Sequence, residues 1–186
     1  LNMVSKLSQN GVAGFILANG ALSGGGEEYK IRKKLIENDI VEAILVLPMK
    51  MFYTTDISVT LWILNANKKE RTFEQNGKTK IHRDRTNEIL FMDLRKLGVA
   101  FEKKFIQFDT ETIEKISSTY HTWQSDKEAY EDIAEYCKSA TLSEVIAKDY
   151  SLVPSKYIEF VNRDENIDFD TKMTALQSEF VELLKE

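Results

Sequence analysis

Short apolar runs alternate with polar or amphipathic segments along the first third of the chain. Three of these runs have the length and composition of buried strands: Val12–Leu17, Val41–Leu47 and Ile57–Leu64. Between the first two, Glu27 to Asn38 places Ile31, Leu35 and Ile36 on one face of a predicted helix. Strands that are apolar throughout, rather than alternating, are typical of an α/β sheet that helices cover on both faces.

The order of these elements predicts how the sheet is connected. The first strand, the helix and the second strand form a βαβ unit, whose crossover is expected to be right-handed. Only nine residues, Pro48 to Asp56, separate the second run from the third. That distance is too short for a crossover helix, so Ile57–Leu64 is predicted to run antiparallel to a neighbouring strand.

A polar stretch follows the third run. Asn76-Gly77 lies between Arg71–Glu74 and Lys78–His82, and this dipeptide is a strong short-range signal of a two-residue β-hairpin. Residues 66–88 are therefore expected to contain an exposed hairpin inserted between strands. The apolar run Ile89–Leu94 predicts one more strand after it.

Helical patterns dominate from Thr110 onward. Cys137 falls in one predicted helix, and Thr141-Leu-Ser-Glu144 has the spacing of a capping box at the start of another. The segment Asp170–Glu186 carries an apolar stripe at helical spacing, formed by Met173, Leu176, Phe180, Val181, Leu183 and Leu184. That stripe can pack on the chain's own domain or against a helix of a partner protein.

Charge is distributed unevenly along the chain. Residues 67–104 hold eleven basic and six acidic side chains, whereas residues 105–186 hold eight basic and eighteen acidic ones. A basic segment attracts phosphate and an acidic one repels it. Charge runs are also common on the solvated surfaces of proteins that bind no nucleic acid, and composition alone favours that interpretation.

Composition excludes several classes of protein. With 42% hydrophobic and 30% charged residues, the chain resembles a folded globular domain rather than a disordered one. Its apolar runs are much shorter than the roughly 20 residues of a membrane-spanning helix, so neither a membrane span nor a secretory signal is expected. One cysteine and two histidines exclude a disulfide framework, disfavour a metal site and fit a cytoplasmic protein.

Most candidate catalytic residues have a simpler structural explanation. Gly24-Gly25-Gly26 precedes a predicted helix, but two glutamates occupy the start of that helix, where a phosphate would bind. His82 and His121 are interpreted as surface residues and Cys137 as a packed one, because none has a catalytic partner in the pattern. The residues alone therefore show no complete active site.

The most informative loop connects the second and third predicted strands. It runs from Leu47 to Ile57 and carries two adjacent aromatic residues, Phe52 and Tyr53. Loops at this edge of an α/β sheet are where such proteins bind ligands. The rings form either a lid over the core or a platform for a planar ligand such as an extruded base.

Six segments occur in an order and spacing that together are fairly specific. They are Gly11-Val-Ala-Gly-Phe-Ile-Leu-Ala-Asn-Gly20, Lys30-Ile-Arg-Lys-Lys-Leu35, Glu42-Ala-Ile-Leu-Val-Leu-Pro48, Met51-Phe-Tyr-Thr-Thr-Asp-Ile57, Leu61-Trp-Ile-Leu-Asn65 and Ile89-Leu-Phe-Met-Asp-Leu-Arg95. This series resembles the modification (M) subunit of type I restriction–modification systems, a family of adenine-N6 DNA methyltransferases. Weaker similarity continues through Tyr150–Tyr157.

The resemblance implies a fold, an activity and partners. It identifies residues 1–108 as the C-terminal part of a Rossmann-like methyltransferase domain, with a basic hairpin insertion at 66–88, and residues 109–186 as a helical C-terminal region. It implies methyl transfer from S-adenosylmethionine to adenine N6 in DNA, in complex with a specificity subunit and a restriction subunit. It further implies that an aromatic residue of the Leu47–Ile57 loop stacks on the flipped adenine, with Phe52 ahead of Tyr53.

In such an assembly the basic segment is expected to approach the DNA backbone. The side chains predicted to make these phosphate contacts are Lys78, Lys80, Arg83 and Arg85. The acidic C-terminal region is expected to stay away from the DNA. Its last helix is expected to hold the specificity subunit.

The sequence also departs from the family pattern. Its only prolines are Pro48 and Pro154, so it lacks the Asn-Pro-Pro-Phe motif that grips the target adenine, and it also lacks the family's cofactor loop. The chain is therefore expected to be a fragment that is inactive alone, with no catalytic residue assigned in it. Two other hypotheses stay open: a non-catalytic α/β interaction module whose acidic helical tail docks a partner, and a stand-alone small-molecule enzyme.

Overall fold

The computed structural model describes residues 2–102, 104–125, 129–161 and 168–183. Five of its strands form one mixed sheet in the order β1–β3–β2–β6–β9. Their bounds are β1 Val12–Ala18, β2 Val41–Val46, β3 Val59–Asn65, β6 Glu88–Asp93 and β9 Cys137–Thr141. β2 and β6 are parallel, whereas β3 is antiparallel to β1 and β2, and β9 is antiparallel to β6. The predicted α/β class, with parallel and antiparallel strands in one sheet, is confirmed.

The predicted βαβ unit is present, but another strand separates its two strands. Helix α1 (Gly26–Glu37) connects β1 to β2, and β3 lies between them in the sheet. Because β3 is antiparallel to both neighbours, β1 and β2 run in the same direction. The short connection after β2 thus reverses the chain, as its length predicted.

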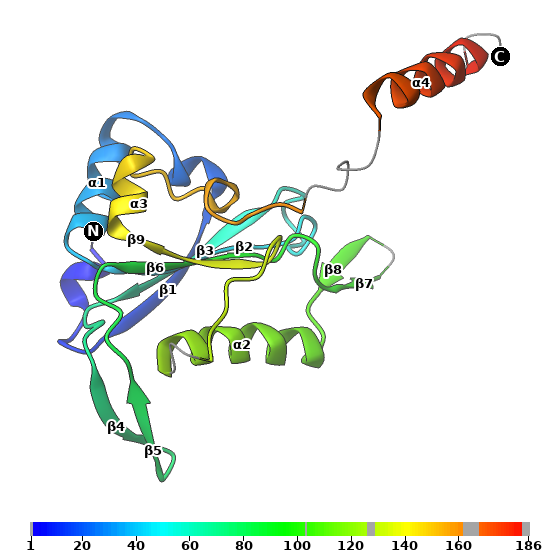
Figure 1. Ribbon diagram of the computed structural model, residues 1–186. Coiled ribbons are helices and arrows are strands. Elements are labelled where there is room, and N and C mark those ends of the chain that lie inside the picture. Colours follow the sequence, from blue (N-terminus) through cyan, green and yellow to red (C-terminus); the bar gives the residue numbers. More distant parts are fainter. Residues whose placement is uncertain (1, 103, 126–128, 162–167, 184–186) are drawn as a thin grey trace.

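Helices cover the two faces of this sheet (Figure 1). α1 and α3 (Leu142–Ala147) lie over one face, and α2 (Thr110–Ser125) lies over the other. Ile44 and Trp62 belong to the core on the α1 side, whereas Leu45 and Trp123 belong to the core on the α2 side. Successive strand residues point to opposite faces. Burial on both faces therefore explains why β2 is apolar at nearly every position.

β1 lacks the burial that its apolar sequence predicted. It lies at the edge of the described sheet and pairs only with β3, and Val12, Ile16 and Leu17 are exposed. The central strand β2, by contrast, is buried along its whole length. An edge strand has a neighbour on one side only, so an apolar composition does not by itself ensure that it is covered.

The hairpin forms where the sequence placed it. β4 (Arg71–Gln75) and β5 (Lys78–His82) pair antiparallel, and the turn residues Asn76 and Gly77 have φ angles of 51° and 70°. Positive φ at both central residues is the geometry of a type I′ turn. The hairpin projects away from the sheet in Figure 1. A second small pair, β7 (Val99–Phe101) and β8 (Phe105–Gln107), lies beyond the other end of the sheet.

The region predicted to be helical contains a strand. Cys137 begins β9, which adds to the sheet beside β6, so its placement on a helix was wrong. The capping box is confirmed, because the Glu144 amide donates to Thr141 Oγ1 and the Thr141 amide donates to Glu144 Oε2. Residues 137–158 contribute to both apolar cores. They therefore belong to the same folded unit as the sheet.

Three short 3-10 helices and one further α-helix complete the described chain. The short ones are η1 (Val4–Lys6), η2 (Asn19–Leu22) and η3 (Pro154–Lys156). Helix α4 (Phe169–Leu183) lies apart from the sheet in Figure 1. Five apolar side chains of this helix are exposed: Phe169, Met173, Leu176, Phe180 and Leu183. The side chain of Val181 and residue 184, predicted to join that stripe, lie outside the described part of the chain.

Candidate functional site

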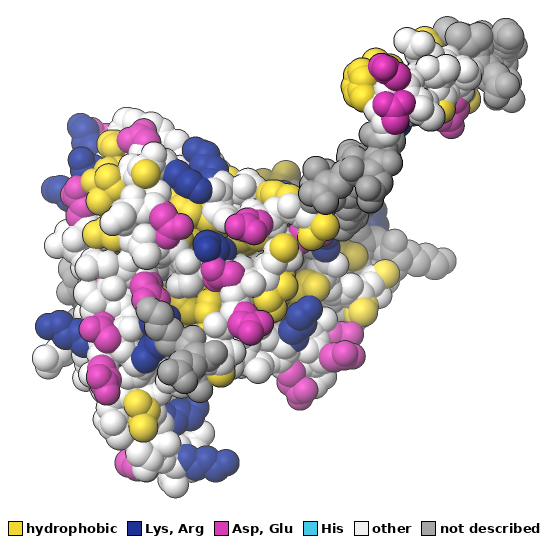
Figure 2. Space-filling view, in the orientation of Figure 1, with side chains coloured by type: hydrophobic (Ala, Val, Ile, Leu, Met, Phe, Trp, Pro, Cys, Tyr) yellow, Lys and Arg dark blue, Asp and Glu magenta, His cyan; other side chains and the backbone are white. Residues whose placement is uncertain are grey.

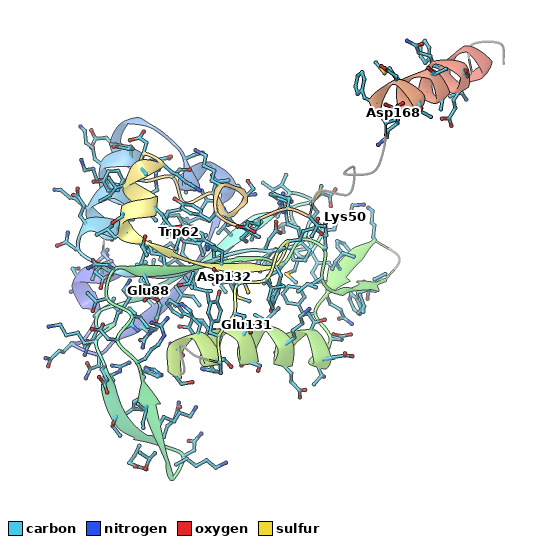
Figure 3. All side chains as sticks on the ribbon, viewed as in Figure 1. Lys50, Trp62, Glu88, Glu131, Asp132 and Asp168 are labelled. Atoms are coloured by element: carbon cyan, nitrogen blue, oxygen red, sulfur yellow. The ribbon has the colours of Figure 1, made fainter. Side chains whose placement is uncertain are left out.

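The carboxyl ends of three strands meet at one edge of the sheet. β1, β2 and β6 run in the same direction, so Ala18, Val46 and Asp93 end at the same side. Figure 3 places Lys50, in the loop after β2, at this end and Glu88, the first residue of β6, near the opposite end. We call the side where these strands finish the carboxyl edge and the side where they begin the amino edge. Both differ from the lateral edges of the sheet, which are formed by the outer strands β1 and β9. Ligands of α/β proteins bind outside the carboxyl ends of the strands.

The Leu47–Ser58 loop at the carboxyl edge is held by its own hydrogen bonds. The Leu47 amide donates to the Val59 carbonyl at 2.8 Å, and Ser58 Oγ donates to the Leu47 carbonyl at 2.6 Å. Lys50 adopts a positive φ of 59°, and its amide donates to the Asp56 carbonyl at 3.3 Å. These bonds tie the two ends of the loop together and fix where its tip projects.

The two aromatic residues of this loop lie in different surroundings. Phe52 is half-buried and packs against the core on the α2 side of the sheet. Tyr53 is 73% exposed, and its ring meets the ring of Phe105 edge-on with centroids 4.8 Å apart. Phe52 therefore closes the core, whereas Tyr53 offers the more accessible ring. The resemblance places Phe52 ahead of Tyr53 for stacking on a flipped adenine, and that ranking stays a prediction.

A pocket of about 370 Å³ also opens at the carboxyl edge. It lies between η2, the ends of β2 and β6, and η3, and its polar side chains include Asn19, Asp93 and Arg95. Asn19 Oδ1 accepts a hydrogen bond from Thr60 Oγ1 at 2.5 Å. The Arg95 guanidinium contacts both carboxylate oxygens of Asp93, with Nε–Oδ1 at 2.9 Å and Nη2–Oδ2 at 2.5 Å. Neither Phe52 nor Tyr53 lines this pocket.

A buried arginine holds two walls of that pocket together. Arg32 takes the inward position on α1 that the sequence assigned to Ile31, which is exposed instead. Its Nη1 donates to the Gly24 carbonyl at 2.9 Å, and its Nε donates to the Tyr150 carbonyl at 2.8 Å. Burial lowers the pKa of Arg32. The side chain thus joins the loop after β1 to the segment that leads into η3.

The four predicted phosphate contacts separate into two pairs. Lys78 and Lys80 are exposed on β5. Arg83 instead pairs with Glu88 at 2.7 Å and donates to the Trp123 carbonyl. Arg85 is fully buried, with its Nη2 atom 3.2 Å from Glu42 Oε1. The structure thus places Arg85 where it cannot reach DNA, because its charge is committed to a buried carboxylate.

Glu42 is the centre of a buried network that sequence reasoning missed. Besides Arg85, its carboxylate accepts hydrogen bonds from Asn65 Nδ2 at 2.8 Å, Tyr120 Oη at 3.1 Å and Gln124 Nε2 at 3.2 Å. Burial, and secondarily the charge of Glu42, raise the pKa of Tyr120. The signal in the sequence was a glutamate inside an otherwise apolar strand. A carboxylate at such a position needs charged or hydrogen-bonding partners.

The basic segment loses much of its free charge to internal pairs. Lys68 is buried, pairs with Asp39 at 2.5 Å and donates to two backbone carbonyls, and burial lowers its pKa. Together with Arg83 and Arg85, it removes three cations from the exposed surface. Figure 2 shows basic and acidic side chains interspersed over the visible face rather than gathered into one basic patch.

The hairpin and the aromatic loop lie at opposite edges of the sheet. The chain leaves β3 at the amino edge and enters the hairpin there, and it returns to begin β6 at the same edge. The aromatic loop precedes β3 and lies at the carboxyl edge. Lys78 and Lys80 therefore do not share a surface with Phe52 and Tyr53.

The remaining candidates show no catalytic arrangement. His121 is exposed, as expected, whereas His82 is half-buried against Phe73. Cys137 is buried, and burial raises the pKa of its thiol. Among the residues that the structure describes, no group of three His, Cys, Asp or Glu side chains is arranged to hold a metal ion. No helix in the described ranges is long and apolar enough to cross a bilayer.

Comparison with known proteins gives a consistent set of relatives. The family model described as N-6 DNA Methylase matches residues 1–166. The chain is 36% identical over its whole length to the type I restriction enzyme HindI methylase subunit of Haemophilus influenzae, of which it covers 38%. It is 32% identical to the MjaIX methylase subunit of Methanocaldococcus jannaschii, again over its whole length and over 31% of that protein. The chain thus spans about a third of the length of these curated relatives.

A solved structure supports the same assignment. The type I restriction–modification methyltransferase subunit from Streptococcus thermophilus is 26% identical and superposes with a TM-score of 0.63. The match covers 81% of this chain and 27% of that protein. The sheet described above is therefore similar to part of a larger methyltransferase subunit.

Proposed function

The chain belongs to the N-6 DNA methylase family, and we propose that it forms part of an enzyme that methylates N6 of adenine in DNA. The methyl donor in this proposal is S-adenosylmethionine. The observation that carries the proposal is the Leu47–Ser58 loop, which holds Phe52 and Tyr53 at the carboxyl edge of the sheet. Because the chain covers about a third of its relatives, the proposal concerns the whole protein and not these 186 residues alone.

The chemistry is compatible with the side chains present. In the proposed reaction the amino nitrogen of adenine would form a bond to the methyl carbon, the bond from that carbon to the donor's sulfur would break with the thioether leaving, and the nitrogen would release a proton to solvent. Such a step depends mainly on alignment of the two reactants, so it needs no nucleophilic side chain. An aromatic ring aligns an extruded base by stacking, which contributes roughly 1–3 kcal/mol per base. Tyr53, whose ring is accessible, is the better placed of the two for this role.

The described residues do not fit the methyl donor. The glycine run before α1 is the one glycine-rich loop that follows a strand in the described ranges, and the Glu28 carboxylate occupies the space beside Gly24. Glu27 and Glu28 also place two negative charges in the first turn of α1. We therefore assign the cofactor site to the remainder of the whole protein and derive no step through it.

A methylation assay tests the proposed activity. The full-length subunit carrying this chain, combined with its specificity subunit, is incubated with radiolabelled S-adenosylmethionine and DNA from a host that does not methylate adenine. We expect label in N6-methyldeoxyadenosine after the DNA is digested to nucleosides. Label in methylcytosine, or no label in DNA, would contradict the proposal.

Helix α4 supports a second role, the docking of a partner subunit. Its exposed apolar residues follow a spacing of four and three residues in alternation: Phe169, Met173, Leu176, Phe180 and Leu183. That spacing is the seam of a coiled coil, which a partner helix buries. Leaving such side chains in water is unfavourable by ~1.5–3 kcal/mol for each large one. We assign the partner helix to the specificity subunit, and we place DNA and the restriction subunit in the same assembly.

Truncation tests the docking role. We expect the full-length subunit without residues 170–186 to lose co-purification with the specificity subunit while its circular dichroism spectrum still shows a folded α/β domain. A matched variant, Thr174→Ala with Ser178→Ala, changes the polar side of α4 and keeps the seam. Retention of the complex after truncation would rule the docking role out.

A further inference from the structure

The pocket at the carboxyl edge is a separate site from the aromatic loop. Its volume of about 370 Å³ falls in the range of ligand pockets, which begins at roughly 300 Å³. The apolar part of its wall comes from Leu22, Val46 and Pro154, all of which are buried. An apolar wall with polar groups on one side suits a molecule that combines a flat ring with a charged or hydroxylated part.

The polar groups of the pocket are mainly donors. Asn19 uses its Oδ1 atom to accept the Thr60 hydroxyl, which leaves the amide Nδ2 hydrogens for a ligand. Asp93 is the acidic residue in the lining, and Arg95 already contacts both of its carboxylate oxygens. Ser23 and Ser155 add hydroxyl groups at the exposed rim. A donor-rich pocket with one neutralised carboxylate favours a phosphate over a cation.

Arg95 is oriented in advance for such a phosphate. Its bidentate contact with Asp93 fixes the plane of the guanidinium, yet the side chain remains 48% exposed. A guanidinium has five N–H donors in a fixed fork, and the contact with Asp93 does not use all of them. The remaining donors are therefore available to an anion that enters from solvent.

The pocket walls are held by interior contacts. Arg32 ties the loop after β1 to the backbone at Tyr150, and the Leu152 amide donates to the Leu22 carbonyl at 2.9 Å. These bonds join two segments that lie far apart in the sequence. The shape of the pocket is thus fixed before a ligand arrives, which reduces the ordering cost of binding.

We propose that this pocket receives one nucleotide of the DNA strand beside the target adenine. Arg95 holds the phosphate, and the buried wall formed by Leu22, Val46 and Pro154 contacts the sugar or the base. The inference rests on the proposed function, since it takes DNA as the substrate. It adds a second contact at the same sheet edge as Tyr53, made by residues on the α1 side of the sheet.

The test measures DNA affinity in the complex of the full-length subunit with its specificity subunit. One variant combines Arg95→Gln with Asp93→Asn, so that no carboxylate is left unpaired. A second, Ser155→Trp, fills the pocket from its rim, and Ser143→Trp on the exposed side of α3 is its matched control. Arg95→Lys keeps the charge and removes the fork. Binding of a 30-base-pair duplex is followed by fluorescence anisotropy between 50 and 250 mM salt, with thermal melting as the check on folding.

We expect the double variant to bind DNA about tenfold more weakly, as for the loss of a charge-assisted hydrogen bond. The slope of log affinity against log salt should fall by about one, the value for one phosphate contact. Ser155→Trp should weaken DNA binding to a similar extent. Arg95→Lys should weaken binding less than the double variant does and should keep the salt slope of the parent protein. The control Ser143→Trp should bind DNA as the parent protein does.

Three outcomes would overturn the inference or its premise. If the parent complex methylates adenine and all pocket variants bind DNA as it does, the pocket is not a DNA site. If deoxyadenosine monophosphate binds the parent protein at micromolar concentration and Ser155→Trp removes that binding but not DNA binding, the pocket serves a free nucleotide. If the parent complex neither binds DNA nor methylates it, the proposed function itself fails.

Discussion

The two edges of the sheet use arginine in opposite ways. At the amino edge Arg85 is fully buried and pairs with Glu42, which also accepts hydrogen bonds from three neutral side chains. At the carboxyl edge Arg95 is 48% exposed and pairs with a single carboxylate. A buried charge with every partner inside the protein serves the fold, whereas a half-exposed and oriented charge is available to a ligand. Charge counted along the sequence does not distinguish these two cases.

The largest expected effect comes from disrupting the buried pair of Arg85 and Glu42. Arg85→Met leaves the Glu42 carboxylate inside the protein without its cation, and we expect a loss of ~3–5 kcal/mol in the free energy of unfolding. Combining Arg85→Met with Glu42→Gln should recover much of that loss, because no uncompensated charge remains. Urea denaturation measures both. If Arg85 instead contacted DNA, the single variant would keep its stability and lose DNA affinity.

The next effect separates the two aromatic residues at the carboxyl edge. We expect Tyr53→Ala to lower kcat/KM for DNA methylation by a factor equivalent to ~1–3 kcal/mol if the ring stacks on the base. The melting temperature should change little, because the exposed ring contacts Phe105 and lies outside the core. Phe52→Ala should lower the melting temperature as well, because Phe52 packs against the core. Tyr53→Phe is the matched control, since it keeps the ring. A Tyr53→Ala variant with full activity would return the platform role to Phe52.

The next prediction tests whether DNA reaches the amino edge, through the salt dependence of DNA binding. Lys78 and Lys80 are the two predicted phosphate contacts that stay exposed on the hairpin. If each contacted a phosphate, replacing both with glutamine would lower the salt slope of DNA binding by about two. Because the hairpin projects from the edge opposite the aromatic loop, we expect the slope to stay unchanged. A fall of about two would show that the duplex extends across both edges.

A pH effect is expected at the base of the hairpin. Burial, and then the nearby charges of Arg85 and Arg71, lower the pKa of His82 to about 4, while Glu42 acts in the opposite direction. Between pH 6.5 and 4 the unfolded chain therefore binds a proton at His82 that the folded chain does not. Stability should fall as pH drops through this range. Melting temperatures at pH 7.5 and 5 should differ less in His82→Gln than in the parent protein.

Local signals in the sequence predicted local structure well. Asn76-Gly77 specifies the hairpin turn because few residues tolerate positive φ at both central positions, and the capping box at Thr141 depends only on residues three apart. The strands β2 and β3 were predicted because apolar β-formers at that length have few alternatives. For the turn and the capping box, the determining contacts lie within a few residues along the chain.

The features that were missed depend on residues far apart in the sequence. β9 has a short and partly polar sequence, Cys137-Lys-Ser-Ala-Thr141, and it is a strand because β6 offers it an edge. The sequence predicts that Arg85 is a basic surface residue, because its partner Glu42 is 43 positions away along the chain. The carboxyl-edge pocket combines the loop after β1 with η3, more than a hundred positions further on. Neither the hydrophobic pattern nor the composition of the sequence indicates which distant residues the fold brings into contact.

The open edge of β1 has a practical consequence for work with these 186 residues on their own. Among the described strands it pairs with β3 alone, and Val12, Ile16 and Leu17 are exposed on it. An uncovered strand with an apolar surface is a template for joining another chain edge to edge. Preparations of this polypeptide alone should therefore self-associate more strongly as concentration rises. A proline at an outward-facing amide of β1, or a lysine in place of Ile16, should keep them monodisperse.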